Sequence, residues 1–118
     1  MHELAIANSI VRTVLEAMDR DGYTAVTRVG LHIGALTDVV PEALVFGFEA
    51  IVKGTALEHT RLDIEQIPIK GKCRECGGEF TIEEFSFVCP LCSGRDIAMS
   101  QGDELDITYL EVVNEEGG

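Results

Sequence analysis

The sequence predicts an α+β fold in which a three-stranded sheet carries two helices on one face and an inserted zinc-ribbon arm extends from it. Three observations support this prediction. Two segments have the helical period of apolar residues, three others alternate apolar and polar residues, and all four cysteines fall between the second and third of these alternating segments. A chain of 118 residues suffices for one packed domain with a small appendage.

The first helix is predicted over residues 3–21, where apolar side chains recur every three or four positions. Gly22 follows and supplies the left-handed conformation that commonly ends a helix. The next element lies within residues 23–34, where apolar residues alternate with small or polar ones from position 29 onward. A period of two predicts a half-buried strand.

A second, shorter helix is predicted to begin at Pro41, which suits the first helical turn, and to stop at Gly54. Alternating side chains predict two further strands, in residues 61–69 and 104–112. Pro68 interrupts the first of these, because proline cannot donate to a strand ladder. The order of elements predicts one sheet with both helices on the same face, interrupted by the cysteine segment.

The sequence separates into two parts of different composition. We expect a helix-and-strand domain in residues 1–69 and 96–118, which carries the N-terminal segment discussed below, and a zinc-ribbon insertion in residues 70–95 whose acids and bases balance. Nine basic and 21 acidic residues give the whole chain a net charge of −12, which repels nucleic-acid phosphates. The apolar runs are short and the start lacks the basic residues of a signal peptide, so we expect a cytoplasmic protein without nucleic-acid or membrane partners.

All four cysteines lie in two CxxC turns, Cys73 with Cys76 and Cys89 with Cys92. The spacing lets both thiolates of a turn converge on one ion, and four thiolates in a tetrahedron fit zinc in a closed, structural site. A rubredoxin-like iron site would use the same ligands, and metal analysis separates the two. Disulfides are disfavoured by the predicted compartment. Residues 79–88, between the turns, are apolar enough for a small hairpin that closes the ribbon.

The N-terminus combines Met1, His2 and Glu3 in a way that suits a planar metal site. The terminal amine, the His2 amide and the His2 ring offer three nitrogens that close adjacent chelate rings. Nickel(II) and copper(II) prefer such donors in a plane, and of the two metals we predict nickel. Glu3 would add its amide as the fourth donor or its carboxylate as an axial ligand. The alternative is a solvated terminus in which Glu3 only favours the positive end of the helix.

Other candidate ligands are weaker. His32 is expected to be a partly exposed strand residue, and His59 is expected to be solvated. Asp38 and Glu42 flank the start of the second helix, where acids act as caps or favour the helix dipole. The sequence contains no recognisable open metal position with a general base, so we expect no catalytic activity.

The motifs with the most information are the start Met1-His2-Glu3-Leu4, the strand end Ile33-Gly34, Phe48-Glu49 on the second helix, the paired CxxC turns, and Gln101-Gly102-Asp103-Glu104-Leu105. Together they resemble the HypA family of hydrogenase nickel-incorporation factors over essentially the full chain. The start and the double CxxC motif are specific in combination, although neither would suffice alone.

The resemblance implies a nickel metallochaperone that serves the [NiFe]-hydrogenase large subunit with the GTPase partner HypB, and in some organisms urease maturation as well. It implies nickel ligands in His2 and Glu3. Some relatives carry an aspartate where this chain has Val40, and histidines beside the CxxC turns that this chain lacks, so we expect no histidine-driven pH response at zinc. The alternative function is a zinc-ribbon module that binds protein or nucleic acid, in which His2 has no metal role.

Overall fold

The computed structural model describes residues 2–113. Their elements are α1 (His2–Asp21), β1 (Ala25–Gly34), the 3-10 turn η1 (Ala35–Thr37), α2 (Pro41–Val52), β2 (Arg61–Ile67), β3 (Ile69–Cys73), β4 (Glu79–Ile82), β5 (Ile97–Gln101) and β6 (Leu105–Val113). They divide into two compact units. The first unit comprises residues 2–31, 39–65 and 106–113, and the second comprises residues 32–38 and 66–105.

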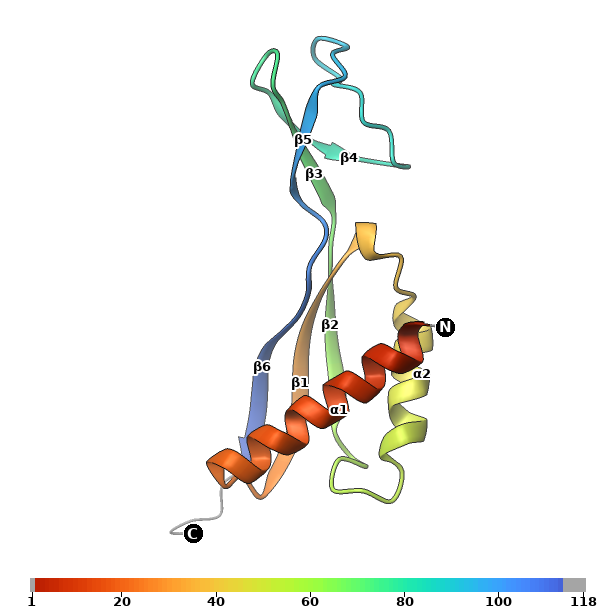
Figure 1. The fold of residues 1–118 in the computed structure, drawn as a ribbon, viewed down its shortest axis with the longest axis vertical. Helices are drawn as coiled ribbons and strands as arrows, with labels where there is room; N and C mark the ends of the chain where they lie inside the picture. Colours follow the sequence, from red (N-terminus) through yellow and green to blue (C-terminus); the bar gives the residue numbers. More distant parts are fainter. Residues whose placement is uncertain (1, 114–118) are drawn as a thin grey trace. The chain divides into compact units, whose positions relative to one another are not determined.

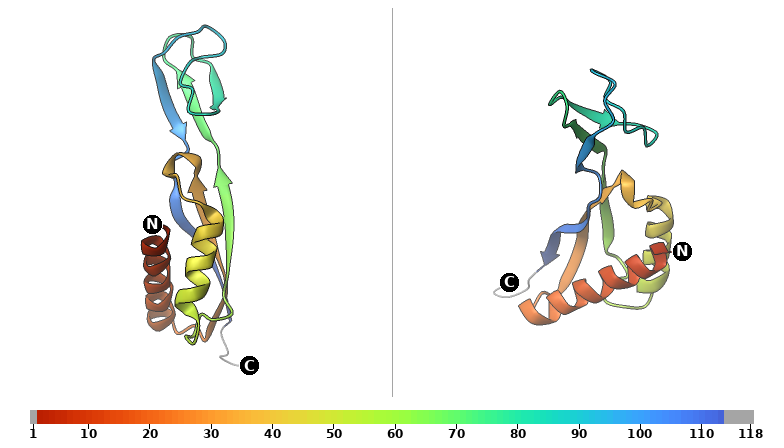
Figure 2. Two further views of the ribbon diagram at one scale, coloured as in Figure 1. Left: turned by 90° about the vertical axis from the view of Figure 1, so that its right-hand side faces the viewer. Right: turned by 45° about the horizontal axis from the view of Figure 1, so that its top comes forward.

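In the first unit, the sheet has the strand order β2-β1-β6, and both helices cover the same face of it (Figures 1 and 2). The predicted α+β class, with two helices on one face of a three-stranded sheet, is therefore confirmed. The amphipathic period of α1 explains its packing, because the residues one or two turns apart face inward together. The side chains that are almost completely buried in this core are Ala7, Val14, Val29, Leu44, Phe48, Val52 and Leu57.

The ends of the two helices follow the predicted residues. Gly22 has a φ of 75° and donates its N–H to the carbonyl of Met18 at 2.8 Å, which closes the C-terminus of α1. Pro41 occupies the first turn of α2, and Val40 precedes it as the N-cap residue. Because valine has no polar side chain, it makes no capping hydrogen bond of its own.

The open face of the first sheet is braced by Tyr109 of β6. A Cβ placed on Gly30 of β1 would lie 2.1 Å from the Tyr109 ring, so the ring lies directly against the glycine backbone. The Tyr109 hydroxyl donates a hydrogen bond to the Asp63 carboxylate on β2. One side chain thereby connects the two outer strands across the central strand, which explains why glycine is required at position 30.

The second unit contains another three-stranded sheet, with the order β4-β3-β5 and antiparallel pairing on both sides of β3. Ile69 pairs with Ile82 of β4, and Cys73 pairs with Ile97 of β5. Gly71 lies in the centre, where a Cβ would meet the Ile97 side chain at 2.6 Å. The predicted strand 61–69 accordingly ends at Ile67, and Ile69 begins β3 after the interruption at Pro68.

The prediction of a hairpin within residues 79–88 is wrong. Only Glu79–Ile82 forms a strand, and the third strand of this sheet is β5, which follows the second CxxC turn. Glu84 and Phe85 have φ values of 54° and 58°, in the left-handed region that a strand cannot pass through. The expectation of a separate insertion bounded at residues 70 and 95 remains a prediction. Among residues 2–113, no helix is long and apolar enough to cross a membrane.

Candidate metal centre

The four cysteines of the second unit converge on one point. Their sulfur atoms all lie within 4.8 Å of one another, with 3.6 Å between Cys73 and Cys92 and 3.6 Å between Cys76 and Cys89. A tetrahedral zinc ion with zinc–sulfur bonds of about 2.3 Å holds its sulfur atoms roughly 3.8 Å apart. The observed spacing therefore fits a metal such as zinc, and the predicted convergence of both CxxC turns is found.

The two CxxC turns have the same hydrogen-bond pattern. In each turn, the N–H of the first cysteine donates to the carbonyl five residues later, and the carbonyl of that cysteine accepts the N–H of the residue after the second cysteine. The distances are 2.9 and 2.8 Å for Cys73 with Gly78 and Gly77, and 2.8 and 2.8 Å for Cys89 with Gly94 and Ser93. Both turns therefore have the same backbone hydrogen bonding, and each brings its two cysteines to the common cluster.

Each turn depends on one residue in the left-handed conformation, directly after its second cysteine. Gly77 occupies this position in the first turn with a φ of 80°, and Ser93 occupies it in the second with a φ of 65°. Glycine adopts this conformation freely, whereas an L-residue such as serine does so at a cost. The second turn therefore contains a serine in a backbone conformation that serine disfavours, whereas the glycine of the first turn carries no such cost.

The electrostatics of the cluster oppose four thiolates without a cation. The Gly94 N–H favours the Cys92 thiolate, but the other sulfur atoms and burial outweigh it and raise the pKa of Cys92 to about 12. Burial also opposes ionisation of Cys89, yet N–H groups of Leu91 and Cys92 together with neighbouring thiols lower its pKa to about 7. The protein groups therefore favour the thiolate of Cys89 and oppose those of Cys76 and Cys92, and a bound divalent cation would supply the charge that these two need.

The N-terminal pair lies in the first unit, at the start of α1. The His2 side chain is 52% exposed, whereas the Glu3 side chain is only 13% exposed. The Glu3 carboxylate accepts the backbone N–H of Val40 at 3.0 Å, and its Oε2 lies 3.9 Å from His2 Nε2. The hydrogen bond from Val40 and the Glu3 backbone N–H lower the pKa of Glu3 to about 2. Met1, the third member of the predicted chelate, lies outside the described residues.

The contact between Glu3 and Val40 was not anticipated from the sequence, in which Val40 stood out only as a departure from a family aspartate. A partial signal was available, because a helix that starts Val40-Pro41 has no capping side chain of its own and needs an acceptor from elsewhere. The expected capping role of Asp38 is not found, since this residue instead follows η1 with a φ of 62°. Glu42 lies in the first turn of α2, where an acid favours the dipole as predicted.

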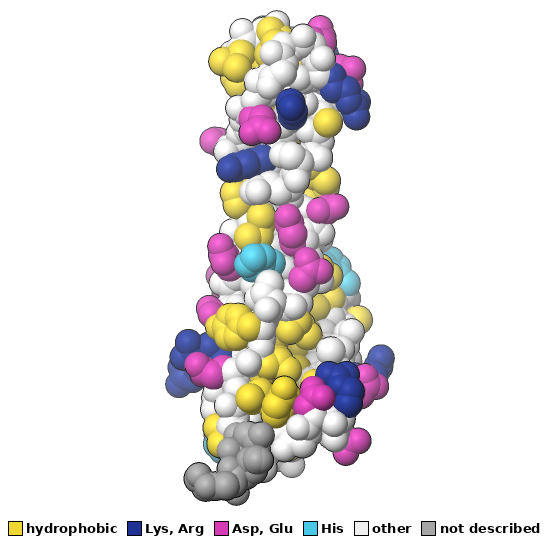
Figure 3. Space-filling model, turned by 90° about the vertical axis from the view of Figure 1, so that its left-hand side faces the viewer, with side chains coloured by type: hydrophobic (Ala, Val, Ile, Leu, Met, Phe, Trp, Pro, Cys, Tyr) yellow, Lys and Arg dark blue, Asp and Glu magenta, His cyan; other side chains and the backbone are white. Residues whose placement is uncertain are grey.

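The two remaining histidines lie on different elements. His32 is a half-buried residue of β1 and His59 is exposed in the segment before β2, as predicted. Among the described residues, the four cysteines are the one group of three or more metal-ligating side chains close enough together to hold an ion. The face of the molecule in Figure 3 carries acidic side chains beside the basic ones, in keeping with the net charge of −12.

The chain is similar to known proteins over nearly its whole length. The family model described as "Hydrogenase/urease nickel incorporation, metallochaperone, hypA" matches residues 1–112. The chain is 38% identical to the hydrogenase maturation factor HypA of Picosynechococcus sp., over 96% of this chain and 100% of the relative. It is 37% identical to HypA of Rhizobium leguminosarum bv. viciae with the same coverage.

The fold also matches a solved structure. The solution structure of the nickel metallochaperone HypA from Helicobacter pylori superimposes with a TM-score of 0.66 at 23% identity, covering 98% of this chain and 100% of that one. At this identity the likeness concerns the fold. Because the family model spans nearly the whole sequence and full-length relatives share more than a third of its residues, the chain belongs to the HypA family of nickel-incorporation metallochaperones.

Proposed function

We propose that the protein carries nickel(II) at its N-terminus and delivers it during maturation of [NiFe]-hydrogenase. The observation that supports this most strongly is the position of His2 and Glu3 at the exposed start of α1. The first N–H groups of a helix have no intrahelical acceptor. The amides of these two residues can therefore lose their protons to a metal without breaking helical hydrogen bonds.

In this proposal, nickel is held by the terminal amine of Met1, the amide and ring nitrogens of His2, and the amide of Glu3. Nitrogen donors in a plane suit nickel(II). The contact of the Glu3 carboxylate with Val40, at 3.0 Å, favours the amide over the carboxylate as the donor from this residue. The carboxylate then acts as a positioning group, which holds the start of α1 beside the start of α2.

The location also suits a site that must release its cargo. The N-terminus of a helix carries partial positive charge, which opposes a bound cation. Binding therefore depends on the negative charge that the amides gain when they lose their protons, and it weakens as the pH falls. A site balanced in this way can pass nickel on during protein docking, whereas a closed thiolate cage would retain it.

We further propose that Cys73, Cys76, Cys89 and Cys92 hold one zinc ion, which crosslinks the two turns of the second unit. With four thiolates the zinc would have no open position, so its contribution would be structural and the chain would catalyse no reaction. The paired geometry of the two turns supports this role.

The expected partners are a HypB-like GTPase and the large subunit of [NiFe]-hydrogenase in the cytoplasm, with urease maturation proteins in organisms that have them. Membership in the family and the names of the maturation-factor relatives support this assignment. We expect the start of α1 to be presented to the GTPase, because it would carry the cargo. Absence of any complex with the cognate GTPase, across nucleotide states and with or without nickel, would remove this partner from the proposal.

The metal content of untagged protein tests the proposal as a whole. Native mass spectrometry of wild type should show one zinc, and one additional nickel after incubation with the ion. His2→Ala should keep the zinc and lose the nickel, so its zinc content serves as an internal control for folding. Wild-type protein that takes up no more nickel than His2→Ala would contradict the carrier function.

A further inference from the structure

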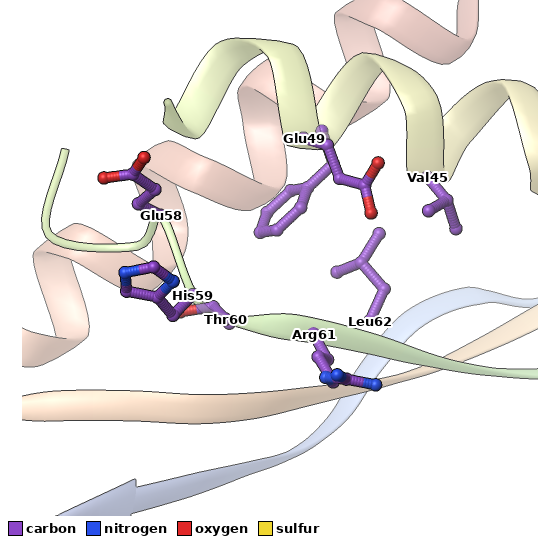
Figure 4. Close-up of a pocket in the computed structure, with 8 residues that line it drawn as sticks. Val45, Glu49, Glu58, His59, Thr60, Arg61 and Leu62 are labelled. Carbon is purple, nitrogen blue, oxygen red and sulfur yellow. The ribbon is translucent and has the colours of Figure 1, made fainter. Parts of the chain in front are cut away.

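A continuous groove runs between α2 and β2 in the first unit. One part of it, of about 510 Å³, is lined by Val45, Phe48, Glu49, Glu58, His59, Thr60, Arg61 and Leu62 (Figure 4). A second part, of about 460 Å³, is lined by Pro41, Glu42, Val45, Phe46, Glu49, Leu62 and Ile64. The two parts share Val45, Glu49 and Leu62, so they lie next to each other in one groove along α2 and β2.

The part of the groove that contains Phe46 and Ile64 is mainly apolar, and carboxylates line both parts. Val45 and Phe46 of α2 face Leu62 and Ile64 of β2 across it. Phe46 is 75% exposed, more than any other large apolar side chain recorded for the described chain. A phenylalanine at this exposure leaves apolar area in water that a partner would remove.

The charged side chains that line the groove favour an occupant of positive charge. Three carboxylates, from Glu42, Glu49 and Glu58, line its two parts. Figure 4 shows Glu49 extending from α2 toward Leu62, whereas the Arg61 side chain leaves β2 on the opposite side from α2. An occupant of the groove therefore meets carboxylates beside its apolar floor, and basic side chains complement them.

The strand that borders the groove is at the edge of its sheet. The order β2-β1-β6 gives β2 one strand neighbour in the described sheet. Figure 1 shows α2 lying beyond this edge, and the shared lining places the helix next to β2. An additional strand placed alongside β2 would have one face covered by α2. Its backbone would pair with β2, and every second side chain would enter the groove.

We propose that this groove binds an extended segment of a partner protein as a fourth strand beside β2, and that the side chains of this segment on the groove face alternate between apolar residues and lysine or arginine. The apolar residues pack against Val45, Phe46 and Leu62, and the basic residues approach Glu42 and Glu49. Main-chain hydrogen bonds to β2 contribute affinity, while the groove gives specificity for alternate side chains. This inference goes beyond the nickel function and does not depend on His2 or on any bound metal.

A second copy of the chain is a poorer occupant than a basic partner. Pairing of β2 with itself would bring the same carboxylates, Glu42 and Glu49, of two copies to one interface. Like charges across an interface are unfavourable, and each chain carries a net charge of −12. The charge at the groove therefore favours a partner of opposite sign.

Three synthetic peptides with blocked ends test the proposal on the full-length, zinc-loaded protein. In all three peptides every second residue is threonine, so that the residues between them share one face of an extended chain. On that face the first peptide alternates lysine and valine, the second glutamate and valine, and the third lysine and serine. Binding is measured by fluorescence anisotropy, and the contacted residues by amide chemical shifts and hydrogen exchange. The lysine-valine peptide should bind more tightly than either control and should slow the exchange of alternate amides along β2.

Two substitutions with matched controls locate the binding site. Phe46→Ser removes the exposed ring and should weaken the binding of the lysine-valine peptide by about tenfold or more. Phe85→Ser makes the same change at another exposed phenylalanine, in the second unit, and should leave binding unchanged. Glu49→Lys should also weaken binding, whereas Glu16→Lys on the exposed side of α1 makes the same change in net charge and should have a much smaller effect.

Three other results would each overturn the proposal. Equal binding of the lysine-valine and lysine-serine peptides would show charge attraction without groove recognition. Binding that perturbs α2 without slowing exchange in β2 would replace strand addition by another mode. Self-association of the wild type that Phe46→Ser abolishes, seen by sedimentation, would make a second copy the occupant. Normal nickel uptake alongside any of these results would leave the carrier function standing.

Discussion

The Glu3 carboxylate accepts the backbone N–H of Val40 at 3.0 Å, so the residue next to His2 supplies the capping acceptor that α2 lacks. This hydrogen bond links two residues that are 37 positions apart in sequence. It attaches the beginning of α1 to the beginning of α2, at the point where the nickel ligands are proposed. The Glu3 side chain therefore has a structural role that is separable from metal binding.

Substitutions of Glu3 should separate these two roles. Glutamine retains an oxygen that can accept the Val40 N–H, so Glu3→Gln should keep both nickel binding and the melting temperature close to those of wild type. Glu3→Ala removes the acceptor and should lower the melting temperature, because an N–H at the start of α2 loses its partner. Circular dichroism melts and nickel titrations of both variants check this. Loss of nickel binding in Glu3→Gln would instead identify the carboxylate as a ligand.

Removing one zinc ligand should affect the two units differently. Structural zinc contributes on the order of 10 kcal/mol to the folding of small zinc modules. Cys73→Ser should therefore disorder the segment around both CxxC turns, while α1 and α2 retain their packing in the first unit. Metal analysis together with two-dimensional NMR checks this. Retention of zinc with a native spectrum for residues 70–95, or an iron-thiolate absorption band in wild type, would contradict the assignment.

The left-handed residues of the two turns should respond to substitution in opposite directions. Ser93→Gly removes the cost of a left-handed serine and should strengthen zinc retention by roughly fivefold to tenfold, equivalent to about 1 kcal/mol. Gly77→Ala should weaken it by a similar or greater factor, although a Cβ there meets no atom within 4 Å. Competition with a chelator measures both. Changes of the same sign in the two variants would contradict the equivalence of the turns.

The brace between Tyr109 and Asp63 should give the first unit a pH-dependent stability. The hydrogen bond to Asp63, burial and the charge of Asp63 all raise the pKa of Tyr109. Because the folded pKa lies above the unfolded one, the stabilisation is complete below the ordinary tyrosine value and is lost as the pH rises through the folded value. The difference in urea midpoint between wild type and Tyr109→Phe should therefore shrink above about pH 10.

An Asp63→Ala background controls this measurement. There, the effect of Tyr109→Phe should be smaller and should lose most of its pH dependence, because the carboxylate that raises the pKa is gone. If the urea midpoints of wild type and Tyr109→Phe instead differed by the same amount at every pH while Asp63 is present, the hydroxyl would make no such contact in solution.

The elements of the first unit could be predicted because each buries one face. Burial on one side leaves a helical period in α1 and places Val29, Leu31 and Ile33 of β1 in the core, and Gly22 and Pro41 mark helix ends for local steric reasons. In β6 the half-buried residues are Ile107, Leu110 and Val112, so the alternation in its sequence does not match its burial. The convergence of the cysteines was predictable for a different reason, since thiolates at CxxC spacing have few other stable arrangements.

The second sheet was not predictable in the same way. Its strands are short, and β5 places no fully buried side chain in the core, so no clear period appears in Ile97–Gln101. Strand pairing there follows from the two turns that bring β3 and β5 together. The contact between Glu3 and Val40 and the groove beside β2 depend on which distant segments meet. Such relationships leave no local pattern in a single sequence.

Nickel titration of untagged protein, followed by calorimetry and visible absorption, tests the carrier function most directly. Wild type should bind one nickel in a site that weakens as the pH falls, because the amine, the imidazole and the amides must lose protons to bind. His2→Ala and a version extended by a few residues before Met1 should both lose this site while keeping their zinc. Equal nickel affinity in all three proteins would contradict the N-terminal chelate.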